Sequence, residues 1–148
     1  MYLTREAIDA NVIARRPEAD EAISGASVLF LGIIRNHSEG RRVLCLEYEA
    51  YEEMAERLIQ DLIEEAKSRW PVDQIQILHR LGKVGLGQIA VGIEVLAAHR
   101  DEAYQASRFL IEGIKRKVPI WKKEYFEDGT SAWSRCQHNE RQLLGSKC

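Results

Sequence analysis

The sequence is short of cysteine, of long apolar runs and of positive charge, and each shortage excludes a class of protein. Its three cysteines are odd in number, widely separated and without a CxxC spacing: Cys45, Cys136 and Cys148. Neither a zinc site nor a disulfide framework is therefore expected, and a reducing cytoplasm suits the chain. No apolar run reaches the ~18 residues that a membrane-spanning helix needs.

The charge and composition leave an ordinary globular protein. The formal net charge of −2 argues against a general nucleic-acid-binding protein, because such proteins are more often basic. The N-terminus carries early charges and no apolar core, so we expect no secretory signal. With 45% hydrophobic and 30% charged residues, the 148-residue chain has a soluble composition and enough length for one domain with a core.

The pattern of apolar residues predicts one α+β domain, residues 1–133, followed by a polar C-terminal tail, residues 134–148. Apolar runs or alternation predict strands at 2–4, 26–34, 42–51, 73–81 and 89–98, and an extended segment from Pro119. Helical spacing predicts two long helices, 51–70 and 100–117, and a short helix from Glu6 to Ala14 capped by Thr4. We expect a mainly antiparallel sheet packed with the two long helices.

Individual segments allow more detailed predictions. The run at 26–34, ASVLFLGII, is almost wholly apolar, which is typical of a central strand buried on both faces, and 42–51 is its expected hairpin partner. The first long helix is expected to bury a stripe formed by Met54, Leu58, Leu62 and Ala66, flanked by Ile59 and Ile63. The acidic residues of this helix match a solvated face better than a metal site, since no histidine accompanies them.

Glycine is concentrated in the segment 82–87, GKVGLG. A nucleotide-binding loop of the GxGxxG or P-loop type would lead into a helix, but the next segment has the pattern of a strand. We therefore interpret this segment as a hairpin connection between the strands at 73–81 and 89–98.

Positive charge is concentrated in one stretch, against the balance of the whole chain. Five of the ten residues from Ile114 to Lys123 are cationic, and local charge that opposes the net charge often serves an anion. His99 and Arg100 begin the preceding helix, about 22 Å from Lys115 at ~1.5 Å per residue. One copy of the helix cannot place both clusters in one small pocket, so either the chain folds back or a second copy completes the site.

Each of these residues also has a structural explanation. A lysine cluster after a helix is often a solvated C-terminal turn, and His99 after an apolar strand can be a buried histidine. Arg35, just past the 26–34 run, is placed either for a binding site or as a solvated loop residue. From the residues alone, the chain is an enzyme or a non-catalytic module that binds phosphate or an acidic partner tail. A lysine Schiff-base enzyme is a third option.

Short motifs run through the chain in a fixed order. They are Gly25-Ala26, Phe30-Leu31-Gly32, Arg35-Asn36-His37, Leu46-Glu47-Tyr48, Arg69-Trp70-Pro71, His79-Arg80-Leu81-Gly82, Ala98-His99-Arg100, Phe109 and the pattern K-x-x-x-P-x-W-K-K from Lys115 to Lys123. Together, at these spacings, they resemble the MoaE family, the large catalytic subunits of molybdopterin synthase. The resemblance covers roughly Gly25 to Trp133.

The resemblance implies an α/β-hammerhead-like fold and a cytoplasmic sulfurtransferase that acts in molybdenum cofactor biosynthesis. Such subunits form a homodimer, and a heterotetramer with small ubiquitin-like (MoaD-like) subunits. The thiocarboxylated C-terminus of the small subunit delivers sulfur to cyclic pyranopterin monophosphate, which gives the dithiolene of molybdopterin. No metal or other cofactor is implied. A site shared between two copies would answer the distance problem stated above.

The functional positions of the family map onto residues of this chain. Lys115 and Lys122 match the two lysines held to be catalytic. The substrate-binding positions correspond to Ile33, Ile34, Arg35, His99, Arg100, Lys123 and Glu124, the last two at the rim. Because a lysine with its free pKa of ~10.4 is a poor base at neutral pH, repulsion within the cluster is expected to lower it.

The chain departs from the family pattern in two places. The hairpin loop reads Gly85-Leu86-Gly87-Gln88, where the family commonly has Gly-Asp, but this loop is not expected at the chemistry. The tail beyond Trp133 matches poorly, which leaves its part in a partner interface open.

Overall fold

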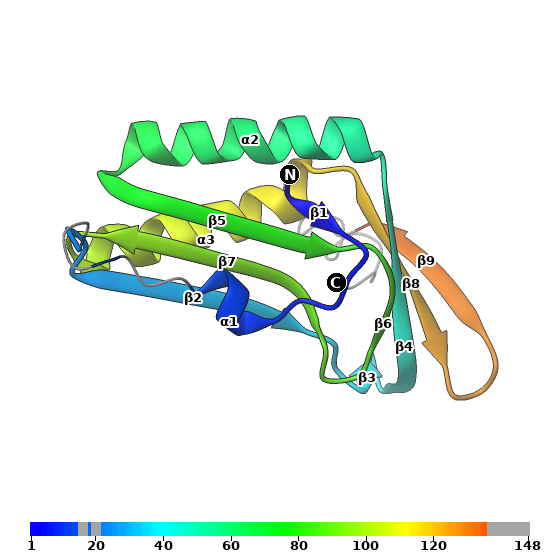
Figure 1. The fold of residues 1–148 in the computed structure, drawn as a ribbon. Coiled ribbons are helices and arrows are strands. Elements are labelled where there is room, and N and C mark those ends of the chain that lie inside the picture. Colours follow the sequence, from blue (N-terminus) through cyan, green and yellow to red (C-terminus); the bar gives the residue numbers. More distant parts are fainter. Residues whose placement is uncertain (15–17, 19–21, 136–148) are drawn as a thin grey trace.

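Two sheets and two long helices form the part of the chain that the computed structural model describes, residues 1–14, 18 and 22–135 (Figure 1). The strands are β1 Leu3–Thr4, β2 Ala26–Ile33, β3 His37–Ser38, β4 Arg41–Ala50, β5 Val72–Arg80, β6 Gly82–Gly85, β7 Ile89–Ala97, β8 Ile120–Phe126 and β9 Ser131–Arg135. The helices are α1 Ala10–Ile13, α2 Glu52–Arg69 and α3 Arg100–Lys117. The predicted α+β class and both long helices are confirmed.

The first sheet has the strand order β1-β5-β7-β2, and only the β1–β5 pair is parallel. The helices α2 and α3 lie together along this sheet, while the short α1 packs against β5 and β7 (Figure 1). At its centre, β7 is buried from Ala90 to Ala97. This strand has neighbours on both edges and both faces, which explains its continuous apolar pattern.

The second sheet is antiparallel, with the order β3-β4-β8-β9 and with β6 also paired to β4. Its strand β8 follows α3 almost directly. Val118, before Pro119, is extended (φ −80°, ψ 128°), so the helix ends as the proline predicts. The chain therefore turns a corner between Lys115 and Lys122, and this corner positions the site described below.

The apolar run of β2 does not form a central strand, so that prediction is wrong. β2 lies at the edge of the first sheet, with Leu29 37% and Ile33 53% exposed. Its partner is β7, and the predicted pairing with 42–51 is also wrong. Instead, β4 forms a tight hairpin with β3, closed by Glu39 and Gly40 at φ 52° and 77°, the positive values that suit a two-residue hairpin turn.

The first helix is shorter than predicted. It spans only Ala10–Ile13, and its N-cap is Asp9, whose side chain accepts a hydrogen bond from the Asn11 N–H. The predicted cap, Thr4, belongs to β1 instead, and its hydroxyl oxygen accepts a hydrogen bond from the Glu6 N–H. A threonine can close a local turn as readily as it can cap a helix, which is why the residue type misled the prediction.

The buried face of α2 is rotated from the predicted stripe. Leu62 and Ala66 are buried as expected, whereas Met54 is 46% exposed. The buried residues of this helix are Ala55, Ile59, Leu62, Ile63 and Ala66. A stripe drawn in steps of four drifts by about 40° per step around a helix of 3.6 residues per turn, so its two ends cannot share one face.

The C-terminal end of the described region was not predicted as a strand. β9 pairs with β8 and extends through Arg135, past the expected domain boundary at Trp133. The division into 1–133 and 134–148 stays a prediction, because residues 136–148 lie outside the described part of the chain.

Candidate functional site

A cavity of about 330 Å³ lies between the two sheets, beside the C-terminal end of α3. Apolar side chains of β2, β4, β7 and α3 form much of its wall. Its polar and charged lining comes from the segment after β2 and from β4, β5, α3 and β8, and consists of Arg35, His37, Ser38, Tyr48, His79, Lys115, Lys122 and Glu124. A concave, largely apolar wall with a few converging polar groups is typical of a small-ligand site.

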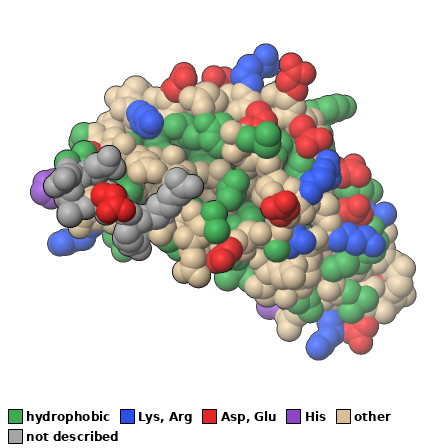
Figure 2. All heavy atoms as spheres, viewed as in Figure 1, with side chains coloured by type: hydrophobic (Ala, Val, Ile, Leu, Met, Phe, Trp, Pro, Cys, Tyr) green, Lys and Arg blue, Asp and Glu red, His purple; other side chains and the backbone are tan. Residues whose placement is uncertain are grey.

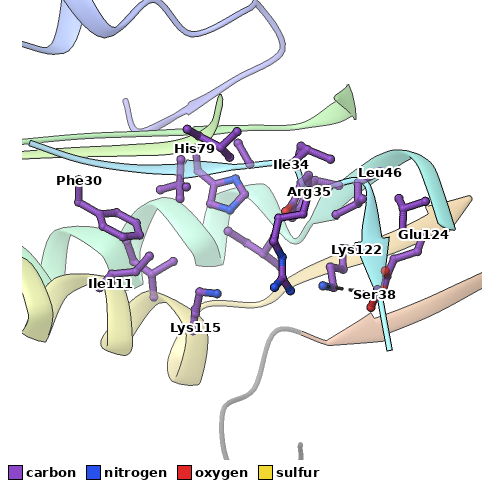
Figure 3. Close-up of a pocket in the computed structure, with 18 of the residues that line it drawn as sticks. Phe30, Ile34, Arg35, Ser38, Leu46, His79, Ile111, Lys115, Lys122 and Glu124 are labelled. Carbon is purple, nitrogen blue, oxygen red and sulfur yellow. Dashed lines mark ion pairs between the residues drawn. The ribbon is translucent and has the colours of Figure 1, made fainter. Parts of the chain in front are cut away.

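Three cationic side chains from separate elements reach this cavity (Figure 3). Arg35 follows β2 directly, Lys115 lies in the last turn of α3, and Lys122 lies in β8. The alternation of β8 turns Lys122 inward. Three like charges around one cavity create a potential that favours an anionic ligand.

Lys122 is the most buried of these cations, with 6% of its surface exposed. Its Nζ lies 3.8 Å from the Oε1 atom of Glu124, itself only 7% exposed. Burial is the largest cause that lowers the pKa of Lys122 to about 8; Glu124 opposes the shift, and the charges of Lys115 and Arg35 add to it. The sequence argument expected repulsion to lower this pKa, but loss of hydration is the larger cause.

Two neutral polar side chains complete the wall, and the sequence argument gave neither a role. The Nδ1–H of His79 donates to the carbonyl oxygen of Arg80 (2.9 Å), and its ring meets Tyr48 edge to face, with 5.1 Å between centroids. Burial, opposed by the hydrogen bond to Arg80 and assisted by the charge of Lys115, lowers the pKa of His79 to about 4, so the ring is neutral at physiological pH. Burial, and then Glu124, raises the pKa of the Tyr48 hydroxyl.

A signal for these residues exists in the sequence, although it is weak. His79 and Tyr48 lie at inward positions near the ends of their strands, where an apolar residue is expected. A polar side chain at such a position needs a hydrogen-bond partner or a ligand.

Comparison with known proteins identifies the family. The family model described as MoaE protein matches residues 3–117 of this chain. The molybdopterin synthase catalytic subunit of Thermoplasma volcanium is 48% identical over 119 residues, which cover 80% of this chain and 83% of that protein. The corresponding subunit of Nostoc sp. is 42% identical over 116 residues, which cover 78% of this chain and 70% of that protein.

The chain belongs to the MoaE family. Its fold agrees with that assignment. The crystal structure of molybdopterin synthase from Staphylococcus aureus matches with a TM-score of 0.76 and 36% identity over 90% of this chain and 95% of that chain. A Helicobacter pylori complex of subunits 1 and 2 of molybdopterin-converting factor matches with a TM-score of 0.75, and at 24% identity this likeness supports the fold alone. The family resemblance read from the short motifs is thereby confirmed.

The structure brings together most of the site residues that the MoaE resemblance implies. The residues around the cavity are Ile33, Ile34, Arg35, Lys115, Lys122 and Glu124. The match to the MoaE family model ends at residue 117. Lys122 and Glu124 therefore depend on the P-x-W-K-K motif and on their position in the cavity wall. Their individual roles stay predictions.

Three implied residues do not line the cavity. His99 and Arg100 lie at the exposed N-terminal end of α3, the far end of the helix from Lys115. The side chain of Lys123 faces the outer side of β8, where its Nζ lies 5.0 Å and 5.6 Å from the ring centroids of Tyr125 and Trp133. Strand alternation therefore removes Lys123 from the predicted rim, while Glu124 lies in the buried wall rather than at the rim.

Within residues 1–14, 18 and 22–135, no group of three or more His, Cys, Asp or Glu side chains could hold a metal ion.

Among the helices of that same region, none is long and apolar enough to cross a membrane.

Proposed function

We propose that this chain transfers sulfur from the thiocarboxylated C-terminus of a small ubiquitin-like subunit to cyclic pyranopterin monophosphate. Family membership makes it a catalytic subunit of molybdopterin synthase, an enzyme of molybdenum cofactor biosynthesis. The observation that supports the finer proposal is the convergence of Arg35, Lys115 and Lys122 on one cavity. Both reactants are anionic, and a cavity lined with three cations suits them.

The residue types match the two anions. Arginine presents a planar set of donors that pairs with phosphate oxygens in a bidentate manner, so Arg35 is assigned to the phosphate of the pterin. Lys115 is assigned to the acyl carbon of the thiocarboxylate. There its charge polarises the carbonyl, so that water can break the C–S bond to the tail after sulfur has bonded to the pterin.

Lys122 is assigned to acid–base steps at the pterin side chain, as the cyclic phosphate opens and water leaves. A pKa of about 8 suits this work, because both protonation states are populated near neutral pH. Each sulfur transfer leaves an ordinary carboxylate on the small subunit, so forming the dithiolene consumes two thiocarboxylated tails.

The assembly is part of the proposal. The curated relatives are named as catalytic subunits of molybdopterin synthase, and this name supports a second subunit as a partner of this chain. His99 and Arg100 are exposed and about 22 Å from Lys115 along α3, which supports a homodimer in which one copy completes the site of the other. Two copies of each subunit then form a heterotetramer. The cytoplasmic location stays a prediction.

A reconstituted assay tests the function. The purified chain is mixed with cyclic pyranopterin monophosphate and a thiocarboxylated small subunit, and molybdopterin is measured as its fluorescent oxidised derivative. We expect product from the wild type and a loss of about 10²–10⁴-fold in Lys122→Ala, the range for removing a general acid or base. Absence of product from the folded wild type with its small subunit bound would contradict the proposal.

The assay also separates an enzyme from an anion-binding module. Arginine keeps the charge of lysine but does not release its proton at neutral pH. A module that only binds would therefore tolerate Lys122→Arg, whereas we expect this variant to bind the substrate and to form almost no product. Full product formation by Lys122→Arg would show that position 122 needs only a positive charge, and would contradict the acid–base role of Lys122.

A further inference from the structure

The turn between β6 and β7 has a role that its sequence did not suggest. It spans Gly85 to Gln88, where the sequence predicts only a hairpin connection away from the chemistry. The Gln88 N–H donates to the Gly85 carbonyl oxygen (3.1 Å), and Gly87 at the third position has a φ of 75°. These features are typical of a β-turn that needs glycine at this position.

The side chain of Gln88 closes the same turn a second time. Its Oε1 atom accepts hydrogen bonds from the Gly85 N–H (2.9 Å) and from Nη1 of Arg80 (3.0 Å) at the end of β5. One amide oxygen thus joins the start of the turn to the neighbouring strand. A side chain that bonds on two sides fixes the turn more firmly than the backbone hydrogen bond alone.

The Gly85–Gln88 turn holds the backbone of Ile34, the residue before Arg35. The Ile34 N–H donates to the Gln88 carbonyl oxygen (3.1 Å), and the Gly87 N–H donates to the Ile34 carbonyl oxygen (2.9 Å). On the other side of Arg35, the Asn36 carbonyl oxygen accepts a hydrogen bond from the Val43 N–H (2.9 Å). Arg35 therefore lies between two anchored residues, one tied to the turn and one tied to the second sheet.

The local geometry makes the first anchor important. The pairing of β2 with β7 shifts register between Gly32 and Ile33, and an irregularity of this kind redirects the side chains that follow it. After this shift, the side chain of Arg35 points into the cavity beside Lys115 and Lys122 (Figure 3). Loss of the bonds at Ile34 would free the backbone from which this guanidinium extends.

We propose that Gln88 is a positioning residue: through the turn and Ile34 it fixes the guanidinium of Arg35 for binding a phosphate group in the cavity. Gln88 itself is exposed and does not line the cavity, so it acts through its hydrogen bonds alone. The inference rests on the proposed function only in taking phosphate as the group that Arg35 binds. It assigns a role to the loop in which this chain departs from the family pattern.

Two variants isolate this role. Gln88→Ala removes the acceptor, whereas Gln88→Glu keeps an acceptor oxygen and adds a charge-assisted contact to Arg80. Leu86→Ala is the matched control, because Leu86 lies in the same turn, is exposed, and has no side-chain hydrogen bond to lose. All three variants are expected to fold, which a thermal unfolding curve checks.

The first test is a double-mutant cycle in the reconstituted assay. We expect Gln88→Ala to raise the KM for cyclic pyranopterin monophosphate about tenfold, the scale of one weakened hydrogen bond to a charged group. Gln88→Glu and Leu86→Ala should stay near the wild-type KM. In an Arg35→Ala background, Gln88→Ala should have no further effect, because the group that it positions is gone. An equal rise in both backgrounds, or no rise in either, would overturn the inference.

The second test does not depend on catalysis. Amide hydrogen exchange by NMR is expected to speed up at Ile34 and Gly87 in Gln88→Ala, while the amides of β8 stay unchanged. Unchanged exchange at Ile34 would overturn the positioning role. If the wild type makes no product, the proposed function fails separately, and the same cycle is run on the dissociation constant of inorganic phosphate. A dissociation constant for inorganic phosphate that changes in neither Arg35→Ala nor Gln88→Ala, or in only one of them, would then contradict the inference.

Discussion

Lys122 and Lys123 are neighbours in the sequence, yet they lie on opposite faces of β8. Lys122 is buried beside Glu124, whereas Lys123 lies over the rings of Tyr125 and Trp133 on the outer face. Strand geometry alone makes this division, because successive side chains of a strand point to opposite sides. At the scale of one residue, reactivity depends on burial and neighbours rather than on residue type.

The pH dependence of sulfur transfer tests this environment. If Lys122 acts as a base, its neutral form is the active one, so the rate should rise with pH through a midpoint near the pKa of about 8. In Glu124→Gln the nearby negative charge that raises this pKa is removed. The pKa should fall, and the rising limb should move to lower pH.

The measurement is the single-turnover rate between pH 6 and 9.5, a range chosen about 1.5 to 2 units either side of that pKa. A rising limb that stays in place in Glu124→Gln, or that moves to higher pH, would show that Lys122 is not the group observed. Substrate affinity is followed in parallel, because Glu124 also lines the cavity.

Each long helix has a distinct part in building the site. α3 ends at Lys117, two residues before Pro119, so Lys115 faces the cavity just before the chain enters β8. α2 does not reach the cavity and supports α3 from outside, where Leu62 packs so closely that a Cβ on Gly113 would lie 2.6 Å from it. In the space-filling view, red and blue charged side chains lie along the upper edge, where Figure 1 draws α2, which fits the amphipathic character of this helix (Figure 2).

A stability comparison within α2 tests its observed buried face. Ile59 is fully buried, so Ile59→Ala should lower the free energy of unfolding by about 2–4 kcal/mol. Met54, which the predicted stripe included, is 46% exposed, and Met54→Ala should cost less than about 1 kcal/mol. Denaturant unfolding measures both free energies. Similar decreases for the two variants would indicate that Met54 belongs to the buried face, as the predicted stripe has it.

At the scale of the whole molecule, one copy contains only part of the implied site. Lys115, Lys122 and Arg35 converge, while His99 and Arg100 lie at the opposite end of α3. The sequence argument left two solutions, a chain that folds back or a second copy. Within one copy, α3 is a continuous helix from Arg100 to Lys117, so the described chain does not fold back between the clusters.

Mixing two inactive variants tests the shared site. Arg100→Ala and Lys122→Ala should each be nearly inactive alone. If copies exchange freely, about one quarter of wild-type activity should return on mixing, since half the dimers are mixed and each has one intact site of two. Size measurements establish the dimer beforehand, and no recovery from a mixture shown to exchange would place each site within one copy.

Much of the fold could be predicted from local patterns. The helical periods at α2 and α3, the strands β5 and β7, and the stop at Pro119 all appear in the structure, because each depends on residues close together in the chain. Strand pairing could not be predicted in the same way. The apolar run of β2 is compatible with a centre or an edge, and only the strand order, in which β2 is last and pairs with β7, decides which.

The candidate site divides along the same line. The sequence by itself determined the family and the cationic residues, because short motifs and residue types can be read without knowing which strands pair. Only the tertiary structure decided that Lys122 faces inward and Lys123 outward, and that His79 and Tyr48 belong to the wall. It also tied the Gly85–Gln88 turn to Ile34. These facts depend on strand register and burial, which arise from contacts between residues far apart in the chain.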